Sequence, residues 1–267
     1  MRVAVLGANG LIGKTTARHL ASIFDVTPIT RQVVDLSNST QTKRYFDNNA
    51  FDIVINAAIN SDSRMDADNS IAKDNLNIFA NLYASRNSFG RVIQFGSGAE
   101  FDRKRSIDNV HEEDLFVSNP TDPYGMSKNL CSRIAYSTDN WYNLRLFGVF
   151  HPSESSSRLL PRILSKIPIT IEDRYFDYFC LEDLLPIIEH YCVNKNPRYK
   201  DINITYPDKM LLGEFVSRFC KINKLSEYNI KYGNYNELAY TGNCSKLQSL
   251  DLPTLGIDLG LSRYIRK

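Results

Sequence analysis

Features common in metal-binding and secreted proteins are scarce in this sequence. The 267 residues include only four histidines and five cysteines, and the cysteines are scattered with no close CxxC pair. An odd, scattered set of cysteines is typical of reduced thiols rather than of a disulfide framework or a zinc site. We therefore expect neither disulfides nor a bound metal.

Long apolar runs and an excess of one charge are also missing. The N-terminal run MRVAVLGANG breaks at a glycine after a few apolar residues, which is too short for a signal peptide. No later run approaches the roughly 18 apolar residues of a spanning helix. The 32 basic and 30 acidic residues leave a net charge of +2, which gives no electrostatic reason to expect nucleic acid or an anionic membrane as partner. These absences predict a cytoplasmic protein.

The sequence does contain a regular alternation of short Val/Ile-rich runs with helical patterns. Expected strands lie at 3–7, 26–30, 33–36, 52–58, 91–97 and 141–150, with helices between them ending near 24, at 40–48, at 70–88 and from 124 onward. Such alternation is typical of a parallel sheet covered on both faces by helices. The predicted fold class is therefore α/β, a doubly wound Rossmann sheet.

After residue 152 the elements become shorter and less regular. Helices are expected at 159–167, 181–192 and 211–222, with strands at 176–181 and 202–205. We interpret residues 1–152 as the Rossmann domain and 153–267 as mainly a small substrate-binding cap, from which strand 176–181 could return to the main sheet. Open α/β sheets bind ligands at the carboxyl ends of their strands, so the cap should recognise the substrate.

A glycine-rich turn joins the first expected strand to the first helix. Gly7 allows a tight turn, Gly10 lets the backbone approach a pyrophosphate, and Gly13 lets helix and strand pack closely. Phosphate oxygens would then face free amides at the helix N-terminus. The predicted dinucleotide contacts in this turn are Gly7, Asn9, Gly10, Leu11 and Ile12.

The same segment, ANGLIGKT, is one residue short of a P-loop. Ala8 stands where the first glycine of a P-loop belongs. A P-loop enzyme would also need an acidic residue at a strand end for magnesium, whereas the strand 52–58 ends in Asn56 and alanines. A dinucleotide is therefore favoured over a nucleoside triphosphate.

The end of the second expected strand discriminates between NAD and NADP. An NAD enzyme places Asp or Glu there for the ribose 2′-hydroxyl, whereas this chain has Arg31 and no carboxylate. A guanidinium suits a 2′-phosphate, although a lone arginine is as often only a solvated surface residue. Asp35 could accept a hydrogen bond from the adenine amino group or simply form a turn, and Leu36 is assigned to the same contact region. The predicted cofactor is NADP(H).

Tyr124 and Lys128 form a YxxxK pattern on an expected helix. Positions i and i+4 share a helix face, so the phenol and the ammonium would stand together, and a nearby ammonium favours the phenolate. In a reduction, Tyr124 would donate a proton to the carbonyl oxygen as hydride arrives, while Ser97 at a strand end polarises the same carbonyl. The alternative is that Tyr124 only packs against the sheet.

Taken in order, these motifs resemble the nucleotide-sugar branch of the extended short-chain dehydrogenase/reductase family. The resemblance covers essentially the whole chain and is carried by GANGLIG (7–13), NAA (56–58), NLNIFANL (75–82), FGSGAEF (95–101), PYGMSK (123–128), LRLFGVFHP (144–152) and YFDYFCLEDL (175–184). It implies a catalytic set of Ser97, Tyr124 and Lys128, with Asn75 completing a proton relay. It further implies that Tyr124 and Lys128 contact the cofactor, and that Ala57 and Ala58 line it.

This sequence lacks residues that particular subgroups of the family need for their reactions, and these differences reduce the number of reactions to be considered. Dehydratases of this family follow the catalytic hydroxyl with Asp-Glu, and GDP-fucose synthases place an epimerising cysteine two residues after the serine, where this chain has Gly98 and Ala99. Arg158 stands near the position of the synthases' histidine acid and is assigned to the substrate together with Ser97 and Tyr124. At Gly148 and His151 the chain also departs from the family's usual asparagine and glycine.

Because the usual acid and base groups for elimination and double epimerisation are missing, simple reduction of a keto group is the reaction that remains. The sequence predicts a homodimeric, NADPH-dependent reductase of a nucleotide-activated 4-keto-6-deoxy sugar. The alternatives are a nucleotide-sugar epimerase, which Arg31 disfavours because such epimerases recycle NAD, and a non-catalytic NADP-binding regulatory protein.

Arg31→Ala tests the cofactor assignment. If the guanidinium binds the 2′-phosphate, the variant should bind NADPH more weakly and NADH about as well as the unmodified chain does, because only NADPH carries that phosphate. Fluorescence titration with both cofactors measures this. Equal losses for the two cofactors would show that Arg31 is only a surface residue.

Overall fold

The computed structural model describes residues 1–59 and 69–265, which divide into two compact units. The first unit comprises residues 1–102, 113–145 and 188–202, and the second comprises 103–112, 146–187 and 203–267. Each unit is therefore assembled from separate stretches of the chain.

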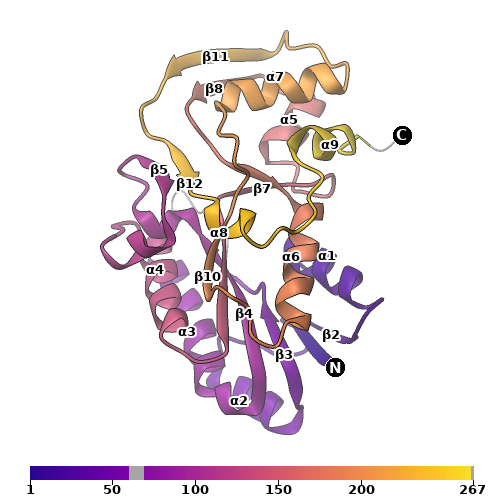
Figure 1. Ribbon diagram of the computed structural model, residues 1–267, viewed down its shortest axis with the longest axis vertical. Coiled ribbons are helices and arrows are strands. Elements are labelled where there is room, and N and C mark those ends of the chain that lie inside the picture. The colour runs from indigo at the N-terminus through magenta and orange to yellow at the C-terminus, as the bar shows by residue number, and fades with distance from the viewer. Residues whose placement is uncertain (60–68, 266–267) are drawn as a thin grey trace. The chain divides into compact units, whose positions relative to one another are not determined.

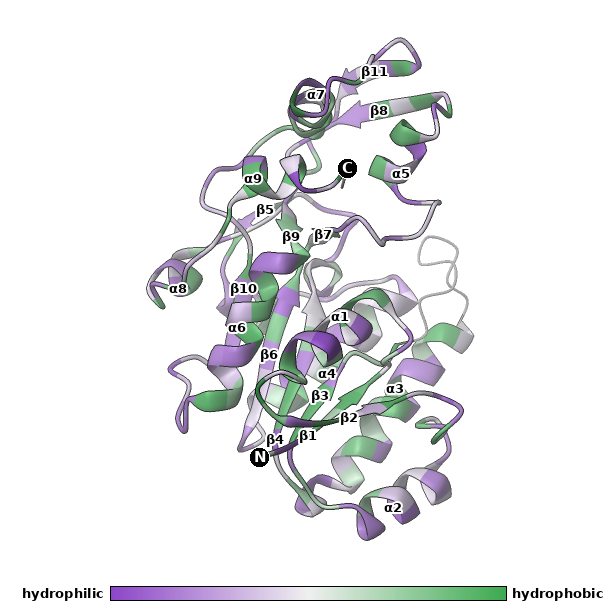
Figure 2. Cartoon of the chain, turned by 90° about the vertical axis from the view of Figure 1, so that its right-hand side faces the viewer, coloured by the Kyte–Doolittle hydropathy of each residue, from purple (hydrophilic) through white to green (hydrophobic). Residues whose placement is uncertain are grey.

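A six-stranded parallel sheet with strand order β10-β6-β4-β3-β1-β2 forms the centre of the first unit (Figure 1). Its strands are β1 (Arg2–Leu6), β2 (Asp25–Ile29), β3 (Phe51–Asn56), β4 (Phe89–Ser97), β6 (Trp141–Leu146) and β10 (Asp201–Ile204). The central strands β1 and β3 are mostly apolar and buried, as expected for strands covered on both faces (Figure 2). The prediction of a doubly wound α/β fold is confirmed.

Helices cover both faces of this sheet. Those with residues in the first unit are α1 (Leu11–Leu20), α2 (Ser39–Asn48), α3 (Asn69–Ala84), α4 (Pro123–Tyr136) and α6 (Leu181–Val193), with 3₁₀ turns η1 (Arg86–Ser88), η2 (Gly98–Phe101) and η3 (Glu112–Phe116). On one face, Phe46 of α2 and Leu82 of α3 share a buried cluster with Trp141 of β6. On the other, His19 of α1 lies 3.1 Å from Glu189 of α6.

The second unit contains three two-stranded sheets instead of one large one. They pair β5 (Ile107–Val110) with β12 (Tyr240–Gly242), β7 (Gly148–Phe150) with β9 (Tyr178–Cys180), and β8 (Ile169–Asp173) with β11 (Ile230–Tyr235). Its other helices are α5 (Leu159–Leu164), α7 (Leu212–Ile222), α8 (Ser245–Gln248) and α9 (Ile257–Ser262). Helix α7 packs on β8 and α9 through buried residues that include Phe215 and Phe219.

Three strand expectations differ from the structure. Residues 33–36 form a turn, because the amides of Val33 and Val34 fold back to the Thr30 carbonyl at 3.0 and 3.1 Å. The expected strand 141–150 breaks after β6, and its end, β7, pairs with β9. The strand that joins the main sheet after residue 152 is therefore β10 rather than 176–181.

The turn between β1 and α1 depends on the absence of side chains. Gly7 has a φ of +69°, and a Cβ there would lie 2.6 Å from the carbonyl oxygen of Ala57. A Cβ on Gly13 would lie 2.4 Å from the carbonyl oxygen of Gly7. Because the obstructing atoms are backbone, a substitution at either position must move the turn relative to β3 or α1.

Gly7→Ala and Gly256→Ala form a matched pair for this constraint. Both glycines have a positive φ, but the Gly256 position is open, with nothing within 4 Å of a Cβ. A positive φ by itself costs a non-glycine residue about 1–3 kcal/mol, both in the left-handed helical region and in the extended region that Gly256 occupies (φ 79°, ψ 172°). We expect Gly7→Ala to lower the free energy of unfolding by more than Gly256→Ala, as measured by urea denaturation. Equal losses would mean that the Ala57 contact adds no cost.

Candidate active site

The first turn of α1 has backbone amides with no side-chain cap. Gly10 is the N-cap residue, and it supplies no side-chain cap and has no acidic residue in the turn that follows. Its own amide donates to the Gly7 carbonyl at 2.9 Å, whereas the amides of Leu11 and Ile12 have no partner within the helix. Asn9 and Gly10 are exposed beside them. Free amides at a helix N-terminus suit the pyrophosphate of a dinucleotide.

The backbone after β3 borders this turn. The amide of Ala57 donates to the Leu6 carbonyl at 3.2 Å, and that of Ala58 donates to Oδ1 of Asn56 at 3.2 Å. Both alanines are half-buried. The ends of β1 and β3 and the start of α1 are thus brought together, as the glycine spacing requires.

Arg31 and Asp35 lie in the turn after β2. The Arg31 side chain is 80% exposed, so a ligand can reach it, and its Nη2 makes a long ion pair of 3.5 Å with Oδ2 of Asp35. Hydrogen bonds from Ser37 and the charge of Arg31 lower the pKa of Asp35. Leu36 differs from its neighbours, because its side chain is buried in the core and its carbonyl accepts from Asn81 at 2.9 Å.

Helix α4 carries Tyr124 and Lys128 one turn apart. The helix starts at Pro123, where the Asp122 carboxylate accepts from the Gly125 amide at 2.8 Å. Lys128 Nζ donates to the Phe95 carbonyl at 2.8 Å, which ties this helix to β4. Tyr124 is 5% exposed and packs with Ile71 and Ala99.

Ser97 ends β4 and caps the 3₁₀ turn η2. Its Oγ accepts from the Ala99 amide at 3.2 Å, which leaves the hydroxyl proton able to point to a substrate oxygen. Because Ala99 also packs on Tyr124, η2 brings the serine and the tyrosine into one neighbourhood. Ser97, Tyr124 and Lys128 are therefore gathered where β4 ends and α4 begins.

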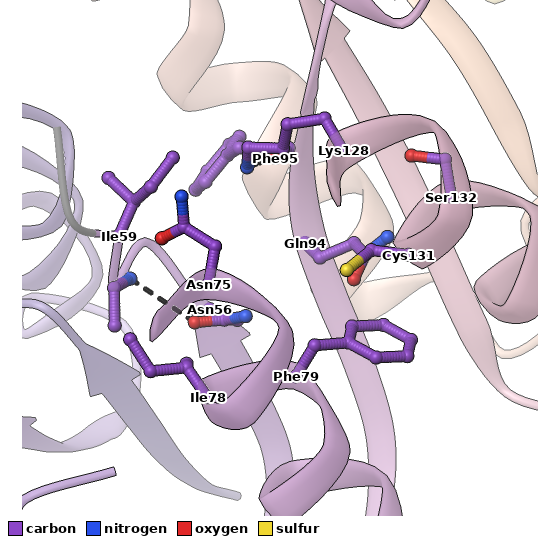
Figure 3. A pocket seen from close by; sticks show the side chains of 11 residues that line it. Asn56, Ile59, Asn75, Ile78, Phe79, Gln94, Phe95, Lys128, Cys131 and Ser132 are labelled. Atoms are coloured by element: carbon purple, nitrogen blue, oxygen red, sulfur yellow. Dashed lines mark hydrogen bonds between the residues drawn. The ribbon is translucent and has the colours of Figure 1, made fainter. Parts of the chain in front are cut away.

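Asn75 of α3 borders the same neighbourhood through a small pocket (Figure 3). The pocket is lined by Asn75 and Lys128 together with Asn56, Gln94 and Ser132, and its volume is about 20 Å³. In Figure 3 the Asn75 amide and the Lys128 side chain point toward the same space beside Phe95. The other lining side chains, among them Ile59, Ile78 and Phe79, are apolar, so the polar groups of Asn75 and Lys128 are the partners that a single water molecule in this space would need.

Arg158 belongs to the second unit, where it is already engaged. Its Nε lies 3.2 Å from Glu154 and its Nη2 donates to the Val149 carbonyl at 3.0 Å. Arg174 shares its surroundings, since burial raises the pKa of Tyr178 to about 12 and both guanidinium groups oppose that shift. The Nε of Arg174 is buried and has no hydrogen-bond partner among the described residues.

Glu100 is the residue that the sequence analysis missed. It is fully buried in η2, and its Oε1 accepts from the Ser97 amide at 2.8 Å. The pattern Ser-x-x-Glu that joins Ser97 to Glu100 is a capping box, and it was readable in FGSGAEF. What the pattern could not supply is the distant residues that surround the carboxylate.

Metal and thiol chemistry have no support in the residues described. Within residues 1–59 and 69–265, no group of three His, Cys, Asp or Glu side chains could hold a metal ion. In the same ranges no helix has the length and apolarity to cross a membrane. All five cysteines are free and buried, and burial raises the pKa of Cys131 to about 12, which suits packing rather than chemistry.

Comparisons with known proteins find similar nucleotide-sugar reductases. The chain is 27% identical over 156 residues to a dTDP-4-dehydrorhamnose reductase of Burkholderia thailandensis, a match that spans 56% of this chain and about half (51%) of that protein. GDP-mannoheptose C4 reductase from Campylobacter jejuni, solved with NADP bound, superposes with a TM-score of 0.83 at 18% identity, over 98% of this chain and 96% of that one.

A dTDP-4-dehydrorhamnose reductase from Bacillus anthracis in complex with NADP superposes with a TM-score of 0.80 at 14% identity, over 98% and 96% of the two chains. At such identities the superpositions establish the fold. The profile of the NAD dependent epimerase/dehydratase family matches residues 3–173, well over half of the chain. The resemblance read from the motifs is thereby confirmed, and the chain belongs to the NAD dependent epimerase/dehydratase family.

Proposed function

We propose that this protein is an NADPH-dependent reductase of a nucleotide-activated 4-keto-6-deoxy sugar. The observation that carries the proposal is the convergence of Ser97, Tyr124 and Lys128 at the junction of β4 and α4. A hydroxyl, a phenol and an ammonium in one neighbourhood suit carbonyl reduction with proton donation. The names of similar proteins, among them dTDP-4-dehydrorhamnose reductase and GDP-mannoheptose C4 reductase, support a sugar nucleotide as substrate.

The residues around the glycine turn fit a dinucleotide. Gly10 leaves the space that a Cβ would fill, 3.3 Å from the Gly7 carbonyl, and the first turn of α1 offers free amides to a pyrophosphate. Arg31 would bind the 2′-phosphate, Ala57 and Ala58 would line the cofactor, and Lys128 would hold the ribose of its nicotinamide end. When bound, NADPH supplies the hydride. Similar folds solved with NADP are consistent with this choice.

The protein's own groups handle the substrate oxygen and its proton. Ser97 would donate a hydrogen bond from its hydroxyl group to the keto oxygen and so polarise the C=O bond. As the carbonyl carbon is reduced, the electron pair of that bond moves to oxygen, which takes the proton of the Tyr124 hydroxyl. The adjacent Lys128 ammonium stabilises the resulting phenolate. One proton from the enzyme thus completes the alcohol.

Tyr124 must then be reprotonated from solvent. The Lys128 ammonium would give a proton to the Tyr124 phenolate, and a water molecule in the small pocket between Asn75 and Lys128 would then return a proton to the Lys128 amine. Asn75 offers both an amide donor and a carbonyl acceptor to such a water. This is the role that the family resemblance implies for Asn75.

Simple reduction is favoured over elimination or epimerisation because no free acid or base follows Ser97. The next residues are Gly98 and Ala99, and the nearby Glu100 carboxylate is fully buried in hydrogen bonds. The family resemblance also assigns Arg158 to the substrate. NADPH oxidation with a panel of dTDP-, GDP- and CDP-linked 4-keto-6-deoxy sugars tests the proposal. Binding of NADPH without turnover on any of them would favour a non-catalytic role.

Tyr124→Phe is the sharpest test of the mechanism, because it removes only the hydroxyl. Folding and NADPH affinity should be unchanged, while kcat should fall by about 10²–10⁴-fold, the usual contribution of general acid catalysis. Lys128→Met should lose turnover and some NADPH affinity, and Ser97→Ala should be milder than either. Stopped-flow NADPH oxidation and fluorescence titration measure the two quantities. Wild-type turnover by Tyr124→Phe would overturn the mechanism.

The protein is further proposed to act as a homodimer through α4. Met126 and Leu130 lie one turn apart on this helix and are 48% and 46% exposed. Phe116 of η3 and Tyr136 of α4, whose rings meet edge to face, are also 42% and 44% exposed. An exposed apolar helix face of this kind suits a helix from a second copy.

Leu130→Asp should convert the dimer to a monomer, as measured by light scattering at micromolar concentration. Leu259→Asp is the matched control, since Leu259 is also 44% exposed but lies on α9 of the second unit. The control should remain dimeric. A monomeric unmodified protein, or a dimer that survives Leu130→Asp, would remove this claim.

A further inference from the structure

A buried cluster of three charged side chains lies beside η2 in the first unit. The Nε of Arg145 lies 2.7 Å from Oε2 of Glu100, and its Nη2 lies 2.6 Å from Oδ2 of Asp201. The three side chains are 0–2% exposed. Two carboxylates and one guanidinium leave this buried cluster with a net negative charge, which needs further donors around it.

The two oxygens of the Glu100 carboxylate accept hydrogen bonds from different donors. Oε2 accepts from Arg145, whereas Oε1 accepts from the Ser97 amide at 2.8 Å and from the Ser132 hydroxyl at 2.9 Å. In addition, Asn129 Nδ2 donates to the backbone carbonyl of Glu100 at 2.9 Å. One residue of η2 therefore contacts β4, β6 and α4 at once.

The α4 contacts of Glu100 lie on the helix that carries Tyr124 and Lys128. Asn129 and Ser132 follow Lys128 by one and four residues. Movement of the Glu100 side chain would thus change the position of the Ser97 backbone relative to α4. Gly96 leaves room for this arrangement, because a Cβ there would lie 2.7 Å from Oε1 of Glu100.

Only an ionised carboxylate can accept from Arg145 on one oxygen and from Ser97 and Ser132 on the other. Burial raises the pKa of Glu100, and the Arg145 guanidinium opposes that shift by favouring the charged form. An uncharged amide of the same shape has one acceptor oxygen, so it must leave either Arg145 or the Ser97 amide facing a donor.

We propose that Glu100 is a positioning residue, which sets the place of the Ser97 hydroxyl relative to Tyr124 by linking the Ser97 amide to Ser132 and Arg145. This inference rests on the proposed reductase function. The ordinary alternative is that Glu100 only caps η2 and stabilises the fold. The two differ in one respect: a positioning residue matters to catalysis only while the Ser97 hydroxyl is present.

A double-mutant cycle between Glu100→Gln and Ser97→Ala separates these roles. In the unmodified chain, Glu100→Gln should lower kcat by about tenfold or more with NADPH affinity unchanged. In the Ser97→Ala background the same change should lower kcat by less than about twofold, because the hydroxyl that it positions is gone. Equal losses in both backgrounds would overturn the proposal.

Asp201→Asn is the matched control. It removes the same charge from the same guanidinium, and Asp201 contacts Arg145 and Asn143 but not Ser97. Both variants should lower the melting temperature, but only Glu100→Gln should lower kcat beyond about twofold. Equal effects of the two variants on kcat would favour a purely structural role. If Glu100→Gln does not fold, Ser132→Ala, which keeps the ion cluster, takes its place in the cycle, and additive losses there overturn the proposal.

Hydrogen–deuterium exchange gives a readout that does not need turnover. The peptide spanning residues 96–101 should exchange at least about tenfold faster in Glu100→Gln than in Asp201→Asn, because Gln cannot accept from the Ser97 amide and from Arg145 at once, so the link that protects this peptide is broken. Unchanged exchange would overturn the inference even where every keto sugar fails as a substrate. Failure of all sugars with faster exchange would instead reject the proposed function and keep the Ser97–Glu100 link.

Discussion

The close approach of backbone at Gly7 and Gly13 is the constraint on which the cofactor region depends. Because neither residue has a Cβ, the turn after β1 can lie against the Ala57 carbonyl while α1 starts against the Gly7 carbonyl. This contact points the free amides of α1 to the edge where the parallel strands end. In an open parallel sheet that edge collects the functional groups, since every strand delivers its last residues there.

Helix α4 connects the chemistry to the sheet. One turn of it carries Tyr124 and Lys128, and the Lys128 ammonium is held on the Phe95 carbonyl of β4. The next turn carries Asn129 and Ser132, which reach η2. A rigid helix therefore sets the spacing between groups on α4 and groups at the end of β4, and catalytic groups must be held within about 0.5 Å of their productive geometry.

The buried ion cluster around Arg145 is better understood as a positioning device than as a source of stability. Replacing a buried ion pair with apolar residues of similar volume is often neutral or stabilising, whereas removing one partner costs about 3–5 kcal/mol. A folded protein therefore gains little net free energy from Glu100, Arg145 and Asp201 that an apolar core would not supply. What an apolar side chain could not do is accept hydrogen bonds from Ser97 and Ser132 at the same time.

The sequence by itself determined the fold class, the family and the elements that carry the local motifs. Glycine spacing, the YxxxK pattern and apolar periodicity act over a few residues, so they are readable without tertiary contacts. The roles assigned to Ser97, Tyr124, Lys128 and Asn75 remain predictions that the geometry supports. Only the tertiary structure decided that residues 33–36 turn, that β10 joins the main sheet, and that Glu100 meets Arg145 and Asp201. The ion cluster joins residues that are 45 or more positions apart in the sequence, and the turn at 33–36 depends on which of several nearby hydrogen bonds forms. A local sequence pattern carries no information about distant partners or about such competition.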